Sequence, residues 1–234
     1  WAMIFNESVE NDSKPVNKTE KFMFDGERLI QHIIKQRYFE EEISNEVNLS
    51  YSDNQVTVTT DYPTLVYTLN SEGYASQCVY SLSSQNRIYQ FSYSAEGYLT
   101  GIVENIDNTE YSSTSLTYEN GDITSISSKM NGLENKFIYE PGEESSTYHL
   151  PCLGLLEIHP LTFHIEALYA GLLGKDPRHF TIRSCPAGSN DEKTIYSYEF
   201  DKKGNPSRMI CQTTYAGGQA SYYPYTRNIS VSFE

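Results

Sequence analysis

The residues best suited to acid–base or metal chemistry are concentrated in one stretch of the chain. Four of the five histidines lie between positions 149 and 179, close to Cys152. Imidazole and thiolate groups bind zinc, but such sites need recognisable ligand spacings such as H-E-x-x-H, and none occurs here. We therefore predict no metal or catalytic cluster and interpret the stretch as an ordinary structural insert. The histidines are His32, His149, His159, His164 and His179.

Other catalytic motifs are also missing from the sequence. There is no G-x-S-x-G nucleophile elbow and no glycine-rich phosphate loop. Acidic residues are numerous, but a glycosidase pair is defined by the distance between two carboxylates in space, and nothing in the sequence singles out a pair. We predict no catalytic, cofactor-binding or metal-binding residue, and no cofactor. A glycan hydrolase is kept as the least favoured alternative.

The 20 tyrosines offer a different kind of chemistry. Tyrosine rings stack on sugar faces and line ligand cavities, whereas tyrosines at every second position of a strand pair with neighbouring strands and fill a core. Most tyrosines here follow the strand pattern. Tyr222, Tyr223 and Tyr225 surround Pro224 in an expected loop, and we predict them as ligand-binding residues.

The four cysteines are Cys78, Cys152, Cys185 and Cys211, and none belongs to a C-x-x-C pair. An even number of cysteines in so polar a chain fits an oxidising compartment. Three pairings are open. We favour Cys152 with Cys185, because this pair brackets the segment expected to be helical. The alternative is a set of thiols without disulfides.

The amino-acid composition limits the class of protein and the partners that can be expected. The 234 residues include 17 Lys and Arg against 31 Asp and Glu, which gives a net charge of −14. Nucleic acids and anionic membranes bind basic faces, so neither is expected as a direct partner. No run approaches the ~20 apolar residues of a membrane-spanning helix. Abundant Tyr, Thr and Ser with little Ala favour β-structure.

A repeated pattern of strands and turns runs through the chain. Large apolar residues stand eight, six and four positions before Gly73, Gly97 and Gly204, with mostly polar residues between them. This alternation is typical of strands with one buried and one solvent-exposed face. Gly73, Gly97 and Gly121 follow one another at intervals of 24 residues, the length of a hairpin with its connector. Asn120-Gly121 is the strongest of the predicted hairpin turns.

Two segments depart from this pattern. Between His159 and Gly174 the apolar residues have a helical period, which predicts a helix over about 161–173 within an insert of about 159–174. The insert would cover a sheet face or plug one end of a barrel. Residues 1–20 are mostly polar and are expected to form an N-terminal arm or linker. Residues 21–234 then form a single β-barrel domain.

We predict an all-β fold of roughly 13 to 15 strands, because sequential hairpins with short connections form an up-and-down meander and so long a sheet has to curl. The favoured architecture is a long antiparallel meander closed or nearly closed into a soluble β-barrel, with one helix inserted late in the chain. Closure removes the exposed sheet edges. A two-layer sandwich is the alternative. The polar face of each strand does not suit lipid, so the aromatic face is expected to point inward.

Two resemblances add to this interpretation. The segments 93–99 and 200–205, with aromatic residues ahead of a glycine, are similar to the tyrosine–aspartate repeats of bacterial surface and toxin-shell proteins. The serial hairpins, the late helical insert and the last hairpin resemble an exported gut-bacterial family of domains of unknown function with a porin-like β-barrel fold. This resemblance implies export to the periplasm or cell surface, commonly as a lipoprotein, and supplies no catalytic residue.

The favoured function is that of a non-catalytic exported cell-envelope domain that binds a glycan, a lipid or an envelope protein. A membrane would be contacted only through a lipid anchor. The alternative is a structural or interaction module without a small ligand. An open, polar-lined cavity on the order of several hundred Å³ favours the binding domain. A closed interior packed with rings favours the module, and two carboxylates facing each other in a cleft favour the hydrolase.

Overall fold

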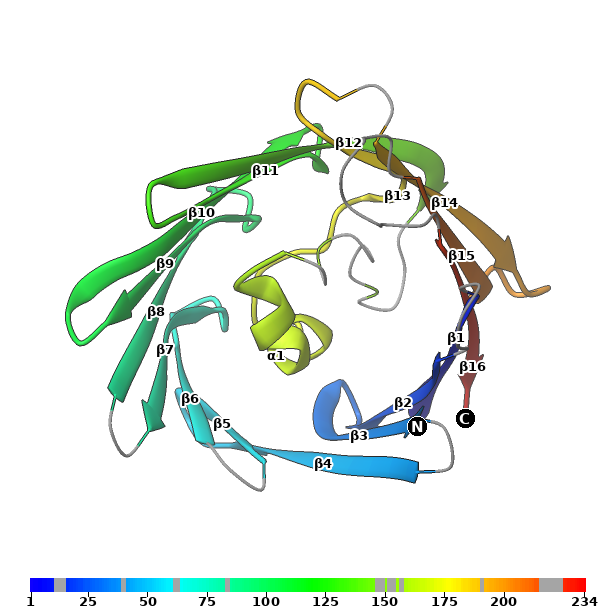
Figure 1. Cartoon of the computed structure of the whole chain (residues 1–234). Coiled ribbons are helices and arrows are strands. Elements are labelled where there is room, and N and C mark those ends of the chain that lie inside the picture. Colours follow the sequence, from blue (N-terminus) through cyan, green and yellow to red (C-terminus); the bar gives the residue numbers. More distant parts are fainter. Residues whose placement is uncertain are drawn as a thin grey trace.

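The chain forms a closed antiparallel barrel of 16 strands within the residues that the structure describes (Figure 1). The structure, a computed structural model, describes residues 1–10, 16–38, 41–60, 64–82, 85–145, 150, 155, 158–189, 192–214 and 225–234. Each strand pairs with its neighbours in the sequence, and β1 pairs with β16 to close the ring. The predicted closed meander is confirmed, and the sandwich is not formed.

The strands are β1 (Ala2–Glu10), β2 (Val16–Asp25), β3 (Arg28–Tyr38), β4 (Glu41–Tyr51), β5 (Gln55–Thr59), β6 (Thr64–Leu69), β7 (Ala75–Leu82), β8 (Gln85–Tyr93), β9 (Leu99–Ile106), β10 (Thr109–Glu119), β11 (Asp122–Met130), β12 (Leu133–Ser145), β13 (His179–Pro186), β14 (Lys193–Phe200), β15 (Pro206–Thr214) and β16 (Tyr225–Phe233).

The alternation of side chains along each strand decides which face is buried. In β5 the side chains of Val56 and Val58 are buried, while those of Gln55 and Thr59 are exposed. Successive side chains of a strand point to opposite faces, so one face of every strand lines the barrel interior. The largest fully buried side chains include Tyr67, Tyr89, Phe22 and Ile102. The prediction that the aromatic face points inward is therefore confirmed.

The expectation of an arm over residues 1–20 is wrong for residues 2–10 and 16–20, which belong to strands β1 and β2. These strands raise the number above the predicted 13 to 15. Their inward positions carry few but large apolar side chains, among them Met3, Phe5 and Phe22. Apart from Ala2 and Ile4, the outward positions of residues 2–10 and 16–20 are polar, for example Asn6, Ser8 and Thr19, although the segment forms the seam of the barrel. Inside that seam Arg227 Nε donates to Glu7 Oε1 at 2.6 Å.

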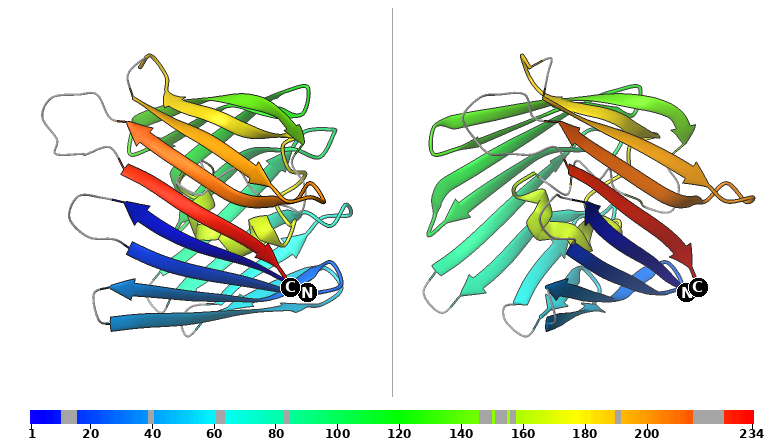
Figure 2. Two further views of the ribbon diagram at one scale, coloured as in Figure 1. Left: turned by 90° about the vertical axis from the view of Figure 1, so that its right-hand side faces the viewer. Right: turned by 45° about the vertical axis from the view of Figure 1, so that its right-hand side comes forward.

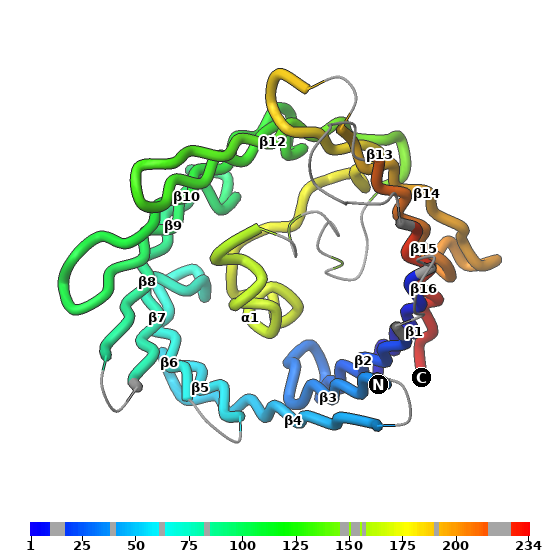
Figure 3. Tube along the Cα trace, in the orientation of Figure 1, coloured from blue at the N-terminus to red at the C-terminus, as the bar shows by residue number. Residues whose placement is uncertain are grey.

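The insert between β12 and β13 lies inside the ring of strands (Figures 1 and 3). It contains a 3₁₀ turn, η2 (Leu161–His164), followed by a single turn of α-helix, α1 (Ile165–Tyr169). The predicted helix over about 161–173 is thus present but shorter, because the chain leaves the helix at Ala170 and turns at Gly171 with φ +69°. Leu172 and Leu173 remain buried beyond the helix. In the described part of the chain, no helix has the length and apolarity to cross a membrane.

The two chain ends lie together at one end of the barrel (Figure 2). Ala2 N donates to Glu234 O, and Glu234 N donates to Ala2 O, both at 2.8 Å. The same end carries the hairpin turns at Gly73, Gly97 and Gly121, because strands alternate in direction around the ring. We call it the turn end. The other end, where β13 connects to β14 and β15 to β16, is called the loop end.

We expect the substitution Gly121→Ala to destabilise the fold more than the matched substitution Gly132→Ala. Both glycines follow an asparagine in a hairpin turn, with φ +88° and +78°. A Cβ atom at Gly121 would lie 2.5 Å from Arg178 Cδ and 2.6 Å from Tyr98 Oη, whereas nothing lies within 4 Å at Gly132. Gly132→Ala should cost about 1–2 kcal/mol for the left-handed backbone alone, and Gly121→Ala measurably more. Urea denaturation of both variants tests this, and equal losses would contradict it.

Candidate functional site

Three histidine contacts join the insert to the barrel wall, and a fourth joins two wall strands beside the exit of the insert. His159 and His164 belong to the insert and each contacts a wall residue, His32 is a wall residue that contacts Glu166 of the insert, and His179, the first residue of β13, contacts Asp122 of β11. The bonds are His159 Nε2 to Glu104 Oε2 at 2.7 Å, Tyr67 Oη to His164 Nδ1 at 2.7 Å, His179 Nδ1 to Asp122 Oδ2 at 2.8 Å, and His32 Nδ1 to Glu166 Oε1 at 2.8 Å. The histidines therefore do not gather at one point, and His149 and Cys152 lie outside the described residues.

Glu104 in β9 is the most heavily hydrogen-bonded carboxylate of the interior. Its side chain is fully buried and accepts bonds from Arg87, Tyr89, Ser112 and His159 at 2.7–3.2 Å. Burial by itself would raise the pKa of Glu104, but the bonds from His159 and Ser112 hold it below its ordinary value. The carboxylate is thus ionised at neutral pH. Ser112 and His159 both donate to it, so the three do not form a nucleophile–base relay.

His32 in β3 lies fully buried between two carboxylates. Its Nδ1 donates to Glu166 of α1, and its Nε2 lies 3.4 Å from Glu20 Oε1 of β2. Phe22 stacks on the imidazole ring with centroids 4.0 Å apart. Burial lowers the pKa of His32, but the bonds with Glu166 and Glu20 outweigh it and raise the pKa above its ordinary value. This contact therefore strengthens when His32 is protonated.

His164, at the end of η2, is in the opposite situation. It is fully buried, with the rings of Tyr89, Phe91 and Phe163 around it, and burial lowers its pKa to about 3. The imidazole is neutral at pH 7 and accepts the bond from Tyr67. Its Nε2 has no hydrogen-bond partner among the described residues. The ring of Tyr89 is perpendicular to the imidazole, and the two ring centroids are 4.4 Å apart. Apolar packing and one hydrogen bond fix this side chain in place.

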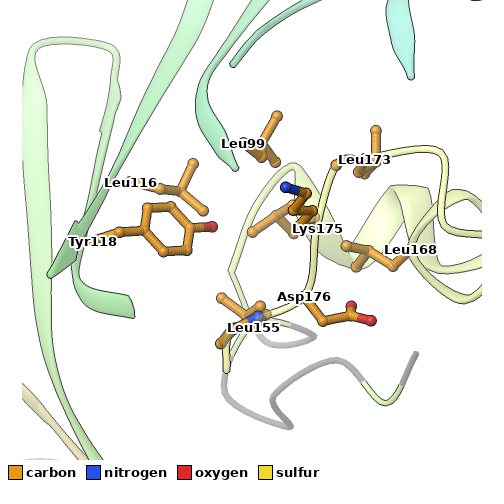
Figure 4. A pocket seen from close by; sticks show the side chains of 11 residues that line it. Leu99, Leu116, Tyr118, Leu155, Leu168, Leu173, Lys175 and Asp176 are labelled. Carbon is orange, nitrogen blue, oxygen red and sulfur yellow. The ribbon is translucent and has the colours of Figure 1, made fainter. Parts of the chain in front are cut away.

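These contacts connect the insert to the wall at separate points. No group of three or more His, Cys, Asp or Glu side chains in the described part of the chain is arranged to hold a metal ion. Near the turn end, leucines of the insert pack on Leu99 and Leu116 of the wall and leave a cavity of only about 20 Å³ (Figure 4). The insert thus fills this side of the barrel interior.

A larger cavity, of about 320 Å³, lies on the other side of the insert at the loop end. We call it the rim pocket. Strands β12 to β15 form its wall, and Ile158 of the insert also lines it. The lining combines aromatic rings with hydroxyl groups, including Tyr139, Tyr196, Ser184, Thr194 and Thr213. Ser184 Oγ and Tyr196 Oη are 3.0 Å apart, as are the hydroxyls of Thr194 and Thr213. Glu192 and Lys193 add one charge of each sign.

Of the three tyrosines predicted as ligand-binding residues, only Tyr225 belongs to the described residues. Tyr222 and Tyr223 lie outside the described residues. Tyr225 is the first residue of β16, and its backbone pairs with Thr213, which lines the rim pocket. The pocket residues on β12 to β15 were not identified from the sequence. Their common feature is a place near the loop end of neighbouring strands, which becomes visible only once the register is known.

The favoured Cys152–Cys185 disulfide is wrong, because Cys185 is a free thiol. Cys185 pairs with Ile138 of β12, close to the rim pocket, which it helps to line. Cys78 is a second free thiol, buried in β7. Burial raises the pKa of Cys78 to about 12. It is therefore protonated at neutral pH and unsuited to act as a nucleophile.

The family comparison agrees with this architecture. The model of a protein family described as "Domain of unknown function (DUF4595) with porin-like fold" matches residues 22–208. The chain belongs to the DUF4595 family. The predicted resemblance to a porin-like family of domains is thereby confirmed, while the likeness of the hairpins to tyrosine–aspartate repeats stays a prediction. The porin-like fold suggests an association of this DUF4595 domain with the cell envelope.

Two solved structures show the same fold as this DUF4595 domain. A porin-like protein from Bacteroides uniformis is 26% identical, with a TM-score of 0.90 over 100% of this chain and 97% of its own. A porin-like protein from Bacteroides vulgatus is 11% identical, with a TM-score of 0.60 over 98% of this chain and 97% of its own, and shows the fold alone. No curated protein matches the chain.

We expect Glu104→Gln to destabilise the domain by about 3 kcal/mol, because it removes the buried negative charge that Arg87 and His159 contact and replaces one of the two acceptor oxygens by an NH2 donor. The matched control is Glu140→Gln, which removes an exposed partner of Arg183 and should cost less than about 1 kcal/mol. Urea denaturation at pH 7 measures both. A loss at Glu104 no larger than at Glu140 would show that the Glu104 contacts do not hold the insert.

His164 should also make the domain less stable in acid. Its pKa is about 3 in the folded chain, so between pH 7 and pH 5 only the unfolded chain takes up the proton, and stability falls as pH falls. The contribution is about 2 kcal/mol over that range. His164→Phe should remove it, giving a shallower loss than the native chain shows. His32, whose pKa is raised, acts in the opposite direction and is unchanged in both proteins.

The control for this measurement is Tyr67→Phe, which breaks the same hydrogen bond but keeps the imidazole buried. It should lower the free energy of unfolding at every pH and retain most of the native pH dependence. Urea denaturation at several pH values measures both variants. If His164→Phe kept the pH dependence of the native chain, His164 would not be the group that destabilises the domain in acid.

Proposed function

We propose that this domain is a non-catalytic exported cell-envelope protein, periplasmic or on the cell surface, that binds a neutral glycan in the rim pocket. The observation that carries the proposal is the lining of that pocket, in which aromatic rings and hydroxyl groups alternate around about 320 Å³. That volume lies within the range of small-molecule sites, about 300–1,000 Å³. A sugar presents apolar ring faces and many hydroxyls, and this lining offers partners for both.

The lining favours a glycan over a lipid, the other small ligand expected from the sequence. An acyl chain has no hydrogen-bonding group and gains nothing from the paired hydroxyls of Thr194 with Thr213 and of Ser184 with Tyr196, whereas sugar hydroxyls can exchange hydrogen bonds with them. The nearby charges, Glu192 and Lys193, are of opposite sign and so do not select an ion of either charge. A polyhydroxylated neutral ligand meets both conditions.

We further propose that Tyr222, Tyr223 and Tyr225 complete the pocket. The connection that carries Tyr222 and Tyr223 begins after Thr214, which lines the pocket, and ends at Tyr225, whose backbone pairs with Thr213. Rings at these positions would supply a stacking surface for the sugar.

The outer wall supports attachment to the envelope through a lipid anchor rather than through the barrel itself. Outward positions of β4 carry Glu46, Asn48 and Ser50, all exposed. Ion pairs on the outer surface join Arg208 to Glu199 across neighbouring strands, and Lys21 of β2 to Glu234, which follows β16. A basic side chain on the lipid face of a membrane barrel costs about 2–4 kcal/mol at the bilayer centre. A wall of this kind favours contact with water, and the net charge of −14 argues against nucleic acid as a partner.

The hydrolase alternative finds little support in the same pocket. Among the described residues that line it, Glu192 is the one carboxylate, whereas glycoside hydrolysis by the common mechanism uses two carboxyl groups about 5–10 Å apart. We therefore assign binding rather than turnover.

Filling the rim pocket should abolish glycan binding. We expect Thr194→Trp to weaken binding of neutral oligosaccharides by at least about tenfold, because the indole occupies the space that the ligand needs. Thr57→Trp, on the outer side of β5 and away from the pocket, makes the same chemical change as a control and should bind normally. Isothermal titration against a panel of neutral gut-type oligosaccharides provides the measurement. No binding by the native domain, or equal weakening by both variants, overturns the proposal.

A further inference from the structure

A second concave surface lies at the turn end of the barrel, opposite the rim pocket. It has a volume of about 750 Å³ and is bounded by the β8–β9 turn, the β10–β11 turn and the segment that leaves the insert. We call it the turn-end groove. None of its residues lines the rim pocket, so a role for the groove is independent of the function proposed above.

The groove holds two exposed cations at fixed positions. Lys175 and Arg178 both lie on the segment that leaves the insert. The backbone N–H of Lys175 donates to Gly97 O at 2.8 Å, and that of Arg178 donates to Gly121 O at 3.0 Å. The segment is thus attached to two neighbouring hairpin turns, and the spacing of the two cations is set by the wall.

Both cations lack an ionic partner within the described part of the chain, where no carboxylate oxygen lies within 4 Å of either. One N–H of the Arg178 guanidinium donates to Asn120 O at 3.3 Å. Glu96 also lines the groove. A hydrogen bond with Ser94 is the main cause of the lowered pKa of its carboxyl, and the charge of Lys175 contributes.

Two aromatic rings lie beside the cations. Tyr98 and Tyr118 stack with centroids 4.9 Å apart and an angle of 29° between the ring planes. Both line the groove and both are half-buried. In Figure 4 the ring of Tyr118 projects from the wall toward the segment that carries Lys175 and Asp176. Thr100 and Asn120 add a hydroxyl and an amide to the same surface.

We propose that the turn-end groove binds an acidic saccharide, with a sugar ring against Tyr98 and Tyr118 and the carboxylate or sulfate group held by Lys175 and Arg178. Guanidinium groups form paired hydrogen bonds with carboxylate and sulfate oxygens, and tyrosine faces accept sugar rings. The rim pocket lacks this pair of like charges, so the two sites select different glycans.

The test compares two double variants that each remove two positive charges. Lys175→Gln with Arg178→Gln changes the groove, and Lys202→Gln with Lys203→Gln changes the exposed β14–β15 turn at the same end of the barrel. The probes are trigalacturonic acid, which carries carboxylates, a sulfated chondroitin disaccharide, and neutral cellotriose, each titrated calorimetrically into the full chain. Which acidic probe binds identifies the anionic group.

We expect at least one acidic probe to bind the native chain, with an affinity that falls as salt is raised. The groove double variant should weaken that binding by about tenfold or more, and the turn double variant should leave it within about twofold. Thr194→Trp, which fills the rim pocket, should not change it. Failure of both acidic probes to bind, or equal weakening by the two double variants, overturns the proposal.

Arg178 also covers Gly121, so its loss needs a separate control for folding. Lys175→Gln alone removes one cation whose side chain makes no hydrogen bond within the described residues, and it should still weaken the acidic probe several-fold. Thermal denaturation of each variant is measured alongside. An unchanged affinity in a folded Lys175→Gln variant would contradict the role of this lysine and, with it, the two-cation site.

Discussion

The interior volume of a 16-strand barrel is the constraint on which the rest of this structure depends. Small barrels fill their interiors with the side chains of their own strands, but a ring of this size encloses more space than its wall can fill. In this chain the insert between β12 and β13 supplies the missing core, with Leu161, Ala167 and Leu173 buried against the wall. A closed wall of this size therefore requires an apolar segment inside it. The polar groups of that segment are buried as well, so they need hydrogen-bond partners on the wall.

Three of the histidine contacts meet this second requirement. Each joins a polar side chain of the insert to a partner on a different strand, which is β3, β6 or β9. The fourth, between His179 and Asp122, joins β13 to β11 where the chain leaves the insert. Buried polar pairs of this kind gain little net free energy, because the cost of removing both groups from water offsets much of their attraction. Their directional bonds restrict where the insert can sit. We infer that apolar packing supplies the stability of the interior while the polar contacts define its one arrangement.

The parts of the fold that follow from short-range patterns could be predicted from the sequence. Alternation before Gly97 and the Asn120-Gly121 turn both depend on neighbouring residues, and both are found in the structure. The contact between His32 and Glu166 spans 134 residues, so no spacing in the sequence indicates it. The rim pocket needs the register of four strands. Strand β1 was missed because its polar outward residues hide an inward row that includes Met3 and Phe5.

The closure of the ring by β1 and β16 places Trp1 and Glu234 side by side. Any polypeptide joined to either terminus would leave the domain from that single end. If such a tether held the barrel at a surface, the turn-end groove would face the attachment and the rim pocket would be presented to the surroundings. The two concavities would then sample different environments, one near the support and one about a strand length further out.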